Sequence, residues 1–184
     1  MMGTKCRGWW LGMAVLACLT AGTTQAGDSQ IGFRVGKVWL KVDADSMISG
    51  EPVDESLGSF GLTFAHRWDP GAYLQWGIGG ATNLNIFSLD SVGHHWLAGG
   101  WQFDLRDEWK LTPKLGAAYS SLEAEDEELF DGHPVSRIHD VIPFVEIAIE
   151  RRLGRHFGLS LFFRENFESW GSSRGWGLSL DWNW

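Results

Sequence analysis

The C-terminal residues of this chain alternate strictly between large apolar side chains and small or polar ones. The apolar phase consists of Trp176, Leu178, Leu180, Trp182 and Trp184. The intervening phase consists of Gly175, Gly177, Ser179, Asp181 and Asn183. Because successive side chains of a β-strand point to opposite faces, this period of two predicts a strand with one apolar face.

The same alternation occurs in seven further runs, at residues 31–42, 60–68, 73–81, 97–106, 109–120, 140–149 and 157–164. In the first run the apolar phase changes near Gly36, which predicts a β-bulge there. Tight turns at 69–71, 106–108 and 154–156 alternate with longer loops at 44–57, 83–93, 122–137 and 168–174. This layout predicts an all-β fold, an eight-stranded antiparallel up-and-down barrel over residues 27–184.

Side-chain volume indicates which face of the barrel points inward. An eight-stranded barrel has an interior that side chains only just fill. The apolar phase, which includes Trp101, Leu161 and Leu180, is too bulky for that space, whereas the Gly, Ala, Ser and Thr of the other phase fit. We therefore expect the apolar face to contact lipid, as in a transmembrane barrel. The alternative is a soluble barrel with its apolar face inside and its charges in solvent.

The small-residue phase also carries basic and acidic residues in equal number. Unpaired buried charges are costly, so a narrow lumen holds such groups only as ion pairs. The sequence therefore predicts a lumen plugged by ion pairs, with Asp69 at one turn taking part. The other candidates are Arg67, Asp104, Arg106, Lys110, Lys114, Asp140, Glu146, Glu150, Arg152, Arg164 and Asp181.

Tryptophan is unusually frequent, with 12 residues against 2 Tyr. Indole rings favour the interface between water and lipid, and transmembrane barrels carry aromatic girdles at both interfaces. Two sets of interface residues are predicted from their places near the ends of the runs. The set beside the tight turns is Trp68, Trp109, Trp182 and Trp184, and the set beside the longer loops is Trp39, Trp96, Trp170 and Trp176.

Residues 1–26 have the pattern of a secretory signal peptide, with a basic start, a short apolar stretch and a small-x-small end. We expect cleavage after Ala26; the alternative is lipidation at Cys18, which follows a loose lipobox. Both cysteines, Cys6 and Cys18, lie in this segment, so disulfides do not stabilise the exported part. The formal net charge of −8 argues against nucleic acid as a partner.

The alternating strands and the ending Leu178-x-Leu180-x-Trp182-x-Trp184 resemble small Gram-negative outer-membrane barrels of the OmpA, OmpX and OmpW type. Two stretches are similar to OmpW in particular, Phe33-Arg34-Val35-Gly36 and Gly61-Leu62-Thr63-Phe64. The resemblance implies a monomer in the outer membrane with its long loops outside. It further implies partners in membrane lipid, in lipopolysaccharide and in the assembly machinery that reads the last strand. It leaves open a structural or binding role and a narrow channel for small apolar solutes.

A third possibility is an enzyme, because lipid A deacylases resemble this chain in size and carry a His-x-Ser-Asn motif on a late strand. The corresponding stretch, residues 162–166, contains neither His nor Ser, so we expect no catalytic residue and no cofactor. No metal is expected either. His94 and His95 are adjacent and point to opposite faces of a strand, and the acidic run 123–131 lacks the ligand spacing of a calcium loop.

Overall fold

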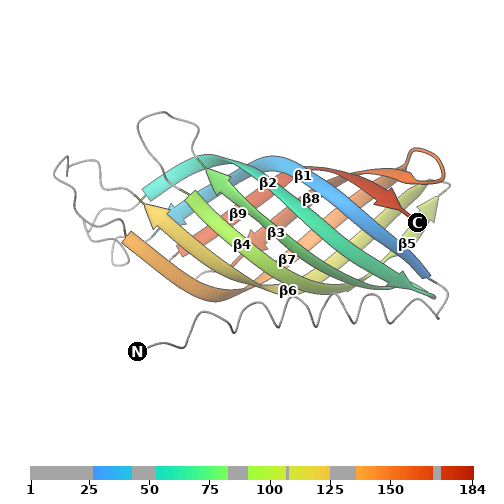
Figure 1. Ribbon diagram of the computed structural model, residues 1–184, viewed down its shortest axis with the longest axis horizontal. Coiled ribbons are helices and arrows are strands. Elements are labelled where there is room, and N and C mark those ends of the chain that lie inside the picture. Colours follow the sequence, from blue (N-terminus) through green and yellow to red (C-terminus); the bar gives the residue numbers. More distant parts are fainter. Residues whose placement is uncertain (1–26, 43–52, 83–90, 107, 125–135, 168–170) are drawn as a thin grey trace, which may run out of the picture.

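The computed structural model describes residues 27–42, 53–82, 91–106, 108–124, 136–167 and 171–184, which form a twisted β-barrel (Figure 1). Every regular element among them is a strand. The strands are β1 (Gly27–Val42), β2 (Val53–Trp68), β3 (Ala72–Thr82), β4 (Ser91–Trp101), β5 (Phe103–Arg106), β6 (Trp109–Ala124), β7 (Ser136–Arg152), β8 (Phe157–Asn166) and β9 (Gly171–Asn183).

The strands pair antiparallel in the order β4-β3-β2-β1-β9-β8-β7-β6-β5, and a further pairing of β4 with β6 closes the sheet on itself. β4 and β5 are consecutive parts of one barrel strand, interrupted at Gln102, since both pair with β6. The result is the closed eight-stranded up-and-down barrel that the sequence predicts. Closure pairs the edge strands with each other, which a sheet in lipid requires.

The strands are longer than the alternation indicates. β2 begins at Val53, whose backbone pairs with Val42, and β6 ends at Ala124, which pairs with Ser136 of β7. The predicted loops 44–57 and 122–137 were therefore too long. Backbone pairing continues beyond the lipid-facing part of each strand, where side chains no longer need to alternate between apolar and polar.

The predicted bulge at Gly36 is wrong, because β1 pairs in continuous register with both β2 and β9. The change of apolar phase has another cause. Leu40 points inward and is buried, while Lys37 and Lys41 on the outward face are exposed. The observed register shift lies elsewhere, between Asp104 and Arg106 at the end of β5.

The large apolar side chains point outward, as their volume predicts. The exposed fractions are 41% for Trp101, 49% for Leu161 and 51% for Leu180. Small inward residues such as Thr63 and Ser179 are buried. An outward apolar face over a polar interior is the arrangement of a barrel in lipid. None of the described residues belongs to a helix long and apolar enough to cross a membrane.

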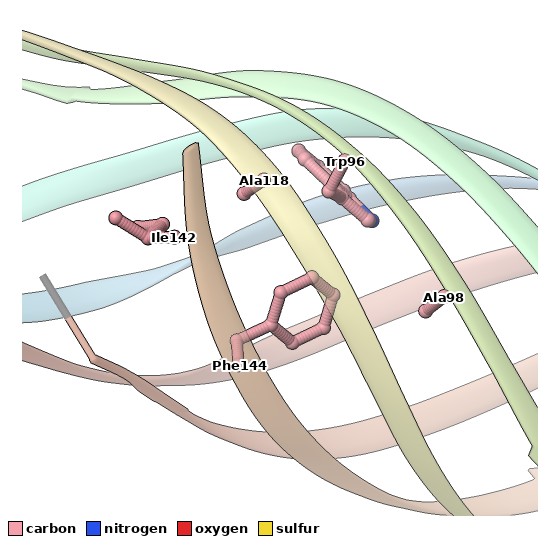
Figure 2. Packing of buried hydrophobic residues seen from close by; sticks show 5 residues of the cluster. All are labelled: Trp96, Ala98, Ala118, Ile142 and Phe144. Carbon is pink, nitrogen blue, oxygen red and sulfur yellow. The ribbon is translucent and has the colours of Figure 1, made fainter. Parts of the chain in front are cut away.

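Several inward side chains are aromatic, and each of these is opposite a glycine of the neighbouring strand. Trp96 pairs with Gly77, and Phe144 pairs with Gly116. A Cβ added at either glycine would collide with the aromatic ring. Trp96 and Phe144 form a buried apolar cluster with Ala98, Ala118 and Ile142 (Figure 2). Inward glycines thus provide the space that these rings occupy in a narrow lumen.

Candidate functional site

A cluster of charges around Glu146 spans the middle of the lumen. The carboxylate of Glu146, on β7, accepts hydrogen bonds from both terminal nitrogens of Arg34 at 2.8 and 2.9 Å. The Nζ of Lys114 lies 2.6 Å from Glu146 Oε1, and Arg164 Nη2 lies 2.6 Å from Oε2. The three cations come from β1, β6 and β8, so this single carboxylate connects four strands.

Neutral polar side chains extend this cluster. Gln75 Oε1 accepts hydrogen bonds from Arg34 at 3.3 Å and from Lys114 at 3.1 Å. Its Nε2 donates to the hydroxyl of Tyr73 at 3.4 Å, and that hydroxyl donates to Gln30 at 2.8 Å. These side chains are thereby joined into one network, and such pairing is what makes a polar interior tolerable.

Aromatic rings contact the same cations. The guanidinium of Arg164 lies 4.2 Å from the ring centre of Phe144 and 4.5 Å from that of Trp96. Arg34 lies 4.5 Å from the ring centre of Phe162. Because three cations share one carboxylate, these cation–π contacts offset part of the remaining positive charge.

A second polar layer lies closer to the short turns. Gln102 connects two charged residues of this layer. Its Oε1 accepts a hydrogen bond from Lys110 at 3.1 Å, and its Nε2 donates one to Glu150 at 3.4 Å. Asp181 accepts hydrogen bonds of 2.6 Å from the hydroxyls of Ser160 and Ser179. The carboxylates of this layer therefore have partners within their own layer.

A third set of charges lies at the short-turn end of the barrel. Arg67 lies 3.7 Å from Asp28, 4.0 Å from Asp69 and 3.9 Å from Asp104. Arg152 lies 3.4 Å from Asp28. These pairs are longer than those around Glu146 and have solvent access.

The structure places the predicted lumen charges at different depths. Lys114, Glu146 and Arg164 meet in one cluster, whereas Lys110, Glu150 and Asp181 belong to the second layer. Arg67 and Arg152 lie at the rim, and Asp140 is half-buried at the far end of β7, where its Oδ1 accepts from the Val141 amide. Asp104 pairs with the inward Lys110 but is exposed at the rim, where it lies beside Arg67. Placing Arg106 in the lumen was wrong, because the register shift in β5 pairs it with the outward Trp109, and it is exposed.

Arg34 is the residue of the cluster that the sequence prediction missed. It lies between the outward-facing Phe33 and Val35, so its inward position follows from the alternation of that run. The predicted bulge near Gly36 implied a change of phase in this run, and no such change occurs.

The interface tryptophans also need one correction. Trp96 is only 5% exposed and lies in the lumen, because it shares the inward phase of Ala98. Trp68 is half-buried, and Trp170 and residues 1–26 lie outside the described residues. The other predicted interface residues are exposed on the outer face: Trp39, Trp109, Trp176, Trp182 and Trp184.

Three further candidates can be placed in part. His94 lines an inner cavity, whereas His95 is exposed on the opposite face of β4. In the stretch that corresponds to the deacylase motif, Arg164 contacts Glu146 and Glu165 accepts a hydrogen bond of 2.8 Å from Arg174. The side chains of the acidic run 123–131 lie outside the described residues.

Comparison with solved structures places this architecture among small outer-membrane barrels. Ail of Yersinia pestis matches with a TM-score of 0.63 and 11% identity, over 87% of this chain and 100% of that one. The N-terminal barrel domain of Pseudomonas aeruginosa OprF gives 0.60 and 10%, over 85% and 97%. OprG from Pseudomonas aeruginosa gives 0.59 and 11%, over 87% and 97%.

No family model matches the sequence, and a search of curated proteins found no significant relative. At identities this low the structural likeness establishes the fold and not the activity. The chain has the fold of the small eight-stranded outer-membrane β-barrels.

Proposed function

We propose that this protein is an integral barrel of the outer membrane with a closed lumen and a structural or binding role, without catalysis. The observation that carries the proposal is the position of Glu146. Its carboxylate is fully buried and is contacted by three cations from other strands. A chain of side chains that crosses a narrow lumen leaves little room for an aqueous path.

Conductance across a planar bilayer tests the closed lumen. We expect the purified protein to insert without resolved channel openings. Glu146→Ala removes the carboxylate that holds three cations together, so this variant should leak. Glu165→Ala is the matched control, because Glu165 lies on the neighbouring strand and pairs outside the cluster with Arg174. Steady openings of the unaltered protein would contradict the proposal.

A location in the outer membrane fits the exposed apolar face of the barrel and the signal-like residues 1–26. The expected result is fractionation with outer membranes and a mature N-terminus at Gly27. A mature chain that starts at a lipidated Cys18 would replace the cleavage proposal and leave the location intact. Recovery in the soluble fraction would contradict the location.

The outward face at the long-connection ends of β1 and β9 supports a partner in lipopolysaccharide. Trp39 and Trp176 stack there with ring centres 6.4 Å apart, and exposed Lys37 and Lys41 flank them. Indoles at an interface with adjacent ammonium groups suit the phosphates of lipid A. Added lipopolysaccharide should raise the unfolding temperature, and K37Q/K41Q should reduce that rise. Arg155→Gln, in the turn at the opposite end, should not.

A catalytic role has no support in the described residues around the late strand β8. Arg164 forms an ion pair with Glu146, and Asn166 donates a hydrogen bond of 2.8 Å to Ser173. We therefore expect lipid A from cells with and without the protein to have the same acyl chains. Loss or gain of an acyl chain in mass spectrometry would contradict this part of the proposal.

One observation favours a second candidate, a conduit for small apolar solutes. A groove of about 700 Å³ lies in the wall formed by β2, β3 and β4. Outward residues such as Phe60 and Ile78 line it together with inward Ala81 and Val92. Uptake of a small apolar solute into protein-containing vesicles tests this candidate. Phe60→Arg should abolish such uptake, and Phe163→Arg on the far side of the barrel should not.

A further inference from the structure

A small inner cavity lies against the Glu146 cluster, on the side toward the long connections. Its volume is about 60 Å³, and its lining includes Arg34, Arg164, His94, Trp96 and Asn166. No carboxylate is among the described residues that line it. The wall on this side is thin because Gly61, Gly79 and Gly175 contribute no side chain to it. The cavity therefore combines a positive lining with unfilled space.

The positive charge of this lining is only partly balanced. Arg34, Lys114 and Arg164 share the single carboxylate of Glu146. Glu150 and Asp181 are the next inward carboxylates; they line a second cavity with Arg34 and Lys114 on the side nearer the short turns, and neither lines this one. Cations that are removed from water attract a counter-charge strongly, so the side of the cluster that faces the cavity favours an anion.

Buried polar atoms without a partner line the same space. Among the described residues, Arg34 Nε is such a donor, and Asn166 Oδ1 is such an acceptor. His94 Nδ1 also has no partner, and it donates or accepts according to its tautomer. Buried polar groups are nearly always satisfied in folded proteins, so Arg34 Nε requires an acceptor in this space and Asn166 Oδ1 requires a donor. Water satisfies donors but contributes no negative charge, whereas an anion does both.

We propose that this cavity binds one small monovalent anion of the halide class, held between the guanidinium groups of Arg34 and Arg164. The volume sets the size of the ligand. A single water needs roughly 10–15 Å³ measured in this way, so the cavity has room for a halide and some water. A sugar or a nucleotide does not fit. The anion would complete the charge balance of the lumen.

Diffraction from crystals grown in bromide provides the direct test, because bromide scatters anomalously. The expected result is an anomalous peak in the cavity between Arg34 and Arg164. Ordered water in that position, with no anomalous peak at saturating bromide, would overturn the proposal. A silent bilayer together with an empty bromide map would remove the anion and leave the closed lumen intact, so the two proposals fail separately.

Chloride titration followed by ³⁵Cl line broadening, in a non-ionic detergent, tests the same site in solution. Arg164→Gln removes one of the two guanidinium groups and leaves the other two cations of the cluster paired with Glu146. We expect this variant to weaken chloride binding by about tenfold, the effect of losing one hydrogen bond to a charged group. Arg174→Gln is the matched control, because exposed Arg174 pairs with Glu165 outside the cluster, and it should bind chloride normally. Equal affinity in all three proteins would overturn the role of Arg164.

Discussion

The two groups of ion pairs in this barrel use the same residue types in opposite environments. The side chain of Glu146 has no solvent exposure, and its contacts with three cations measure 2.6–2.9 Å. At the rim, Asp104 is 76% exposed and lies 3.9 Å from Arg67. An exposed pair contributes little to stability, whereas removing one partner of a buried pair leaves an uncompensated charge. Depth in the lumen therefore determines what each charge does.

The largest expected effect comes from breaking the buried group. Glu146→Gln leaves three buried cations without their carboxylate and should lower the free energy of unfolding by about 3–5 kcal/mol. Urea unfolding in lipid vesicles, followed by tryptophan fluorescence, measures this change. A loss below about 1 kcal/mol would place Glu146 in the same class as the rim charges.

The next effect tests whether the middle of the outward face contacts lipid. Leu161 lies outward in the middle of β8, so Leu161→Arg places a charge in lipid and should cost about 2–4 kcal/mol. Leu153→Arg is the matched control, because Leu153 is exposed at the short turn after β7, where the cost should be about 0–1 kcal/mol. Equal costs in vesicle unfolding would show that Leu161 does not face lipid.

A smaller effect tests the packing between inward rings and glycines. Gly77→Ala places a methyl group against the indole of Trp96 and should cost about 1–3 kcal/mol through overpacking. Gly99→Ala provides the control, since the nearest atom to its added Cβ is 4.0 Å away. The double variant Gly77→Ala/Trp96→Ala should cost less than the sum of the two single variants, because the added methyl group then has no indole to collide with. A cost equal to that sum would argue against this contact.

The smallest effect comes from the rim. Asp104→Asn should change the free energy of unfolding by no more than about 1 kcal/mol, because both Asp104 and Arg67 have access to solvent. High salt should reduce the difference further. If Asp104→Asn costs as much as Glu146→Gln in the same unfolding assay, burial is not what separates the two groups.

Side-chain volume and alternation were sufficient to predict the barrel, its strand count and the direction of its faces. The exceptions are two inward residues whose face the alternation indicates correctly. Trp96 has the inward phase of Ala98, but its place near a long loop led to an interface prediction. Arg34 has the inward phase between Phe33 and Val35, but this run was predicted to change phase near Gly36. At both positions the period of two gave the right face.

Alternation cannot predict which inward residues meet. Arg34 and Glu146 are 112 residues apart in the sequence and are brought together by the stagger of the strands around the barrel. That stagger fixes the height of each side chain in the lumen, and no local pattern reports it. The same limit explains why Lys110 and Lys114, only four residues apart, belong to different layers.

The central claim is that bulky apolar side chains face lipid while charges and small side chains fill the lumen. Nuclear Overhauser effects from detergent acyl chains to protein side chains test it most directly. We predict such effects at Leu161, Leu178 and Leu180 and none at Thr63, Glu146 or Ser179. Leu178 and Leu180 flank Ser179 in β9, so neighbouring residues of one strand should differ. Acyl-chain contacts at Thr63, Glu146 and Ser179, with none at the leucines, would contradict the claim.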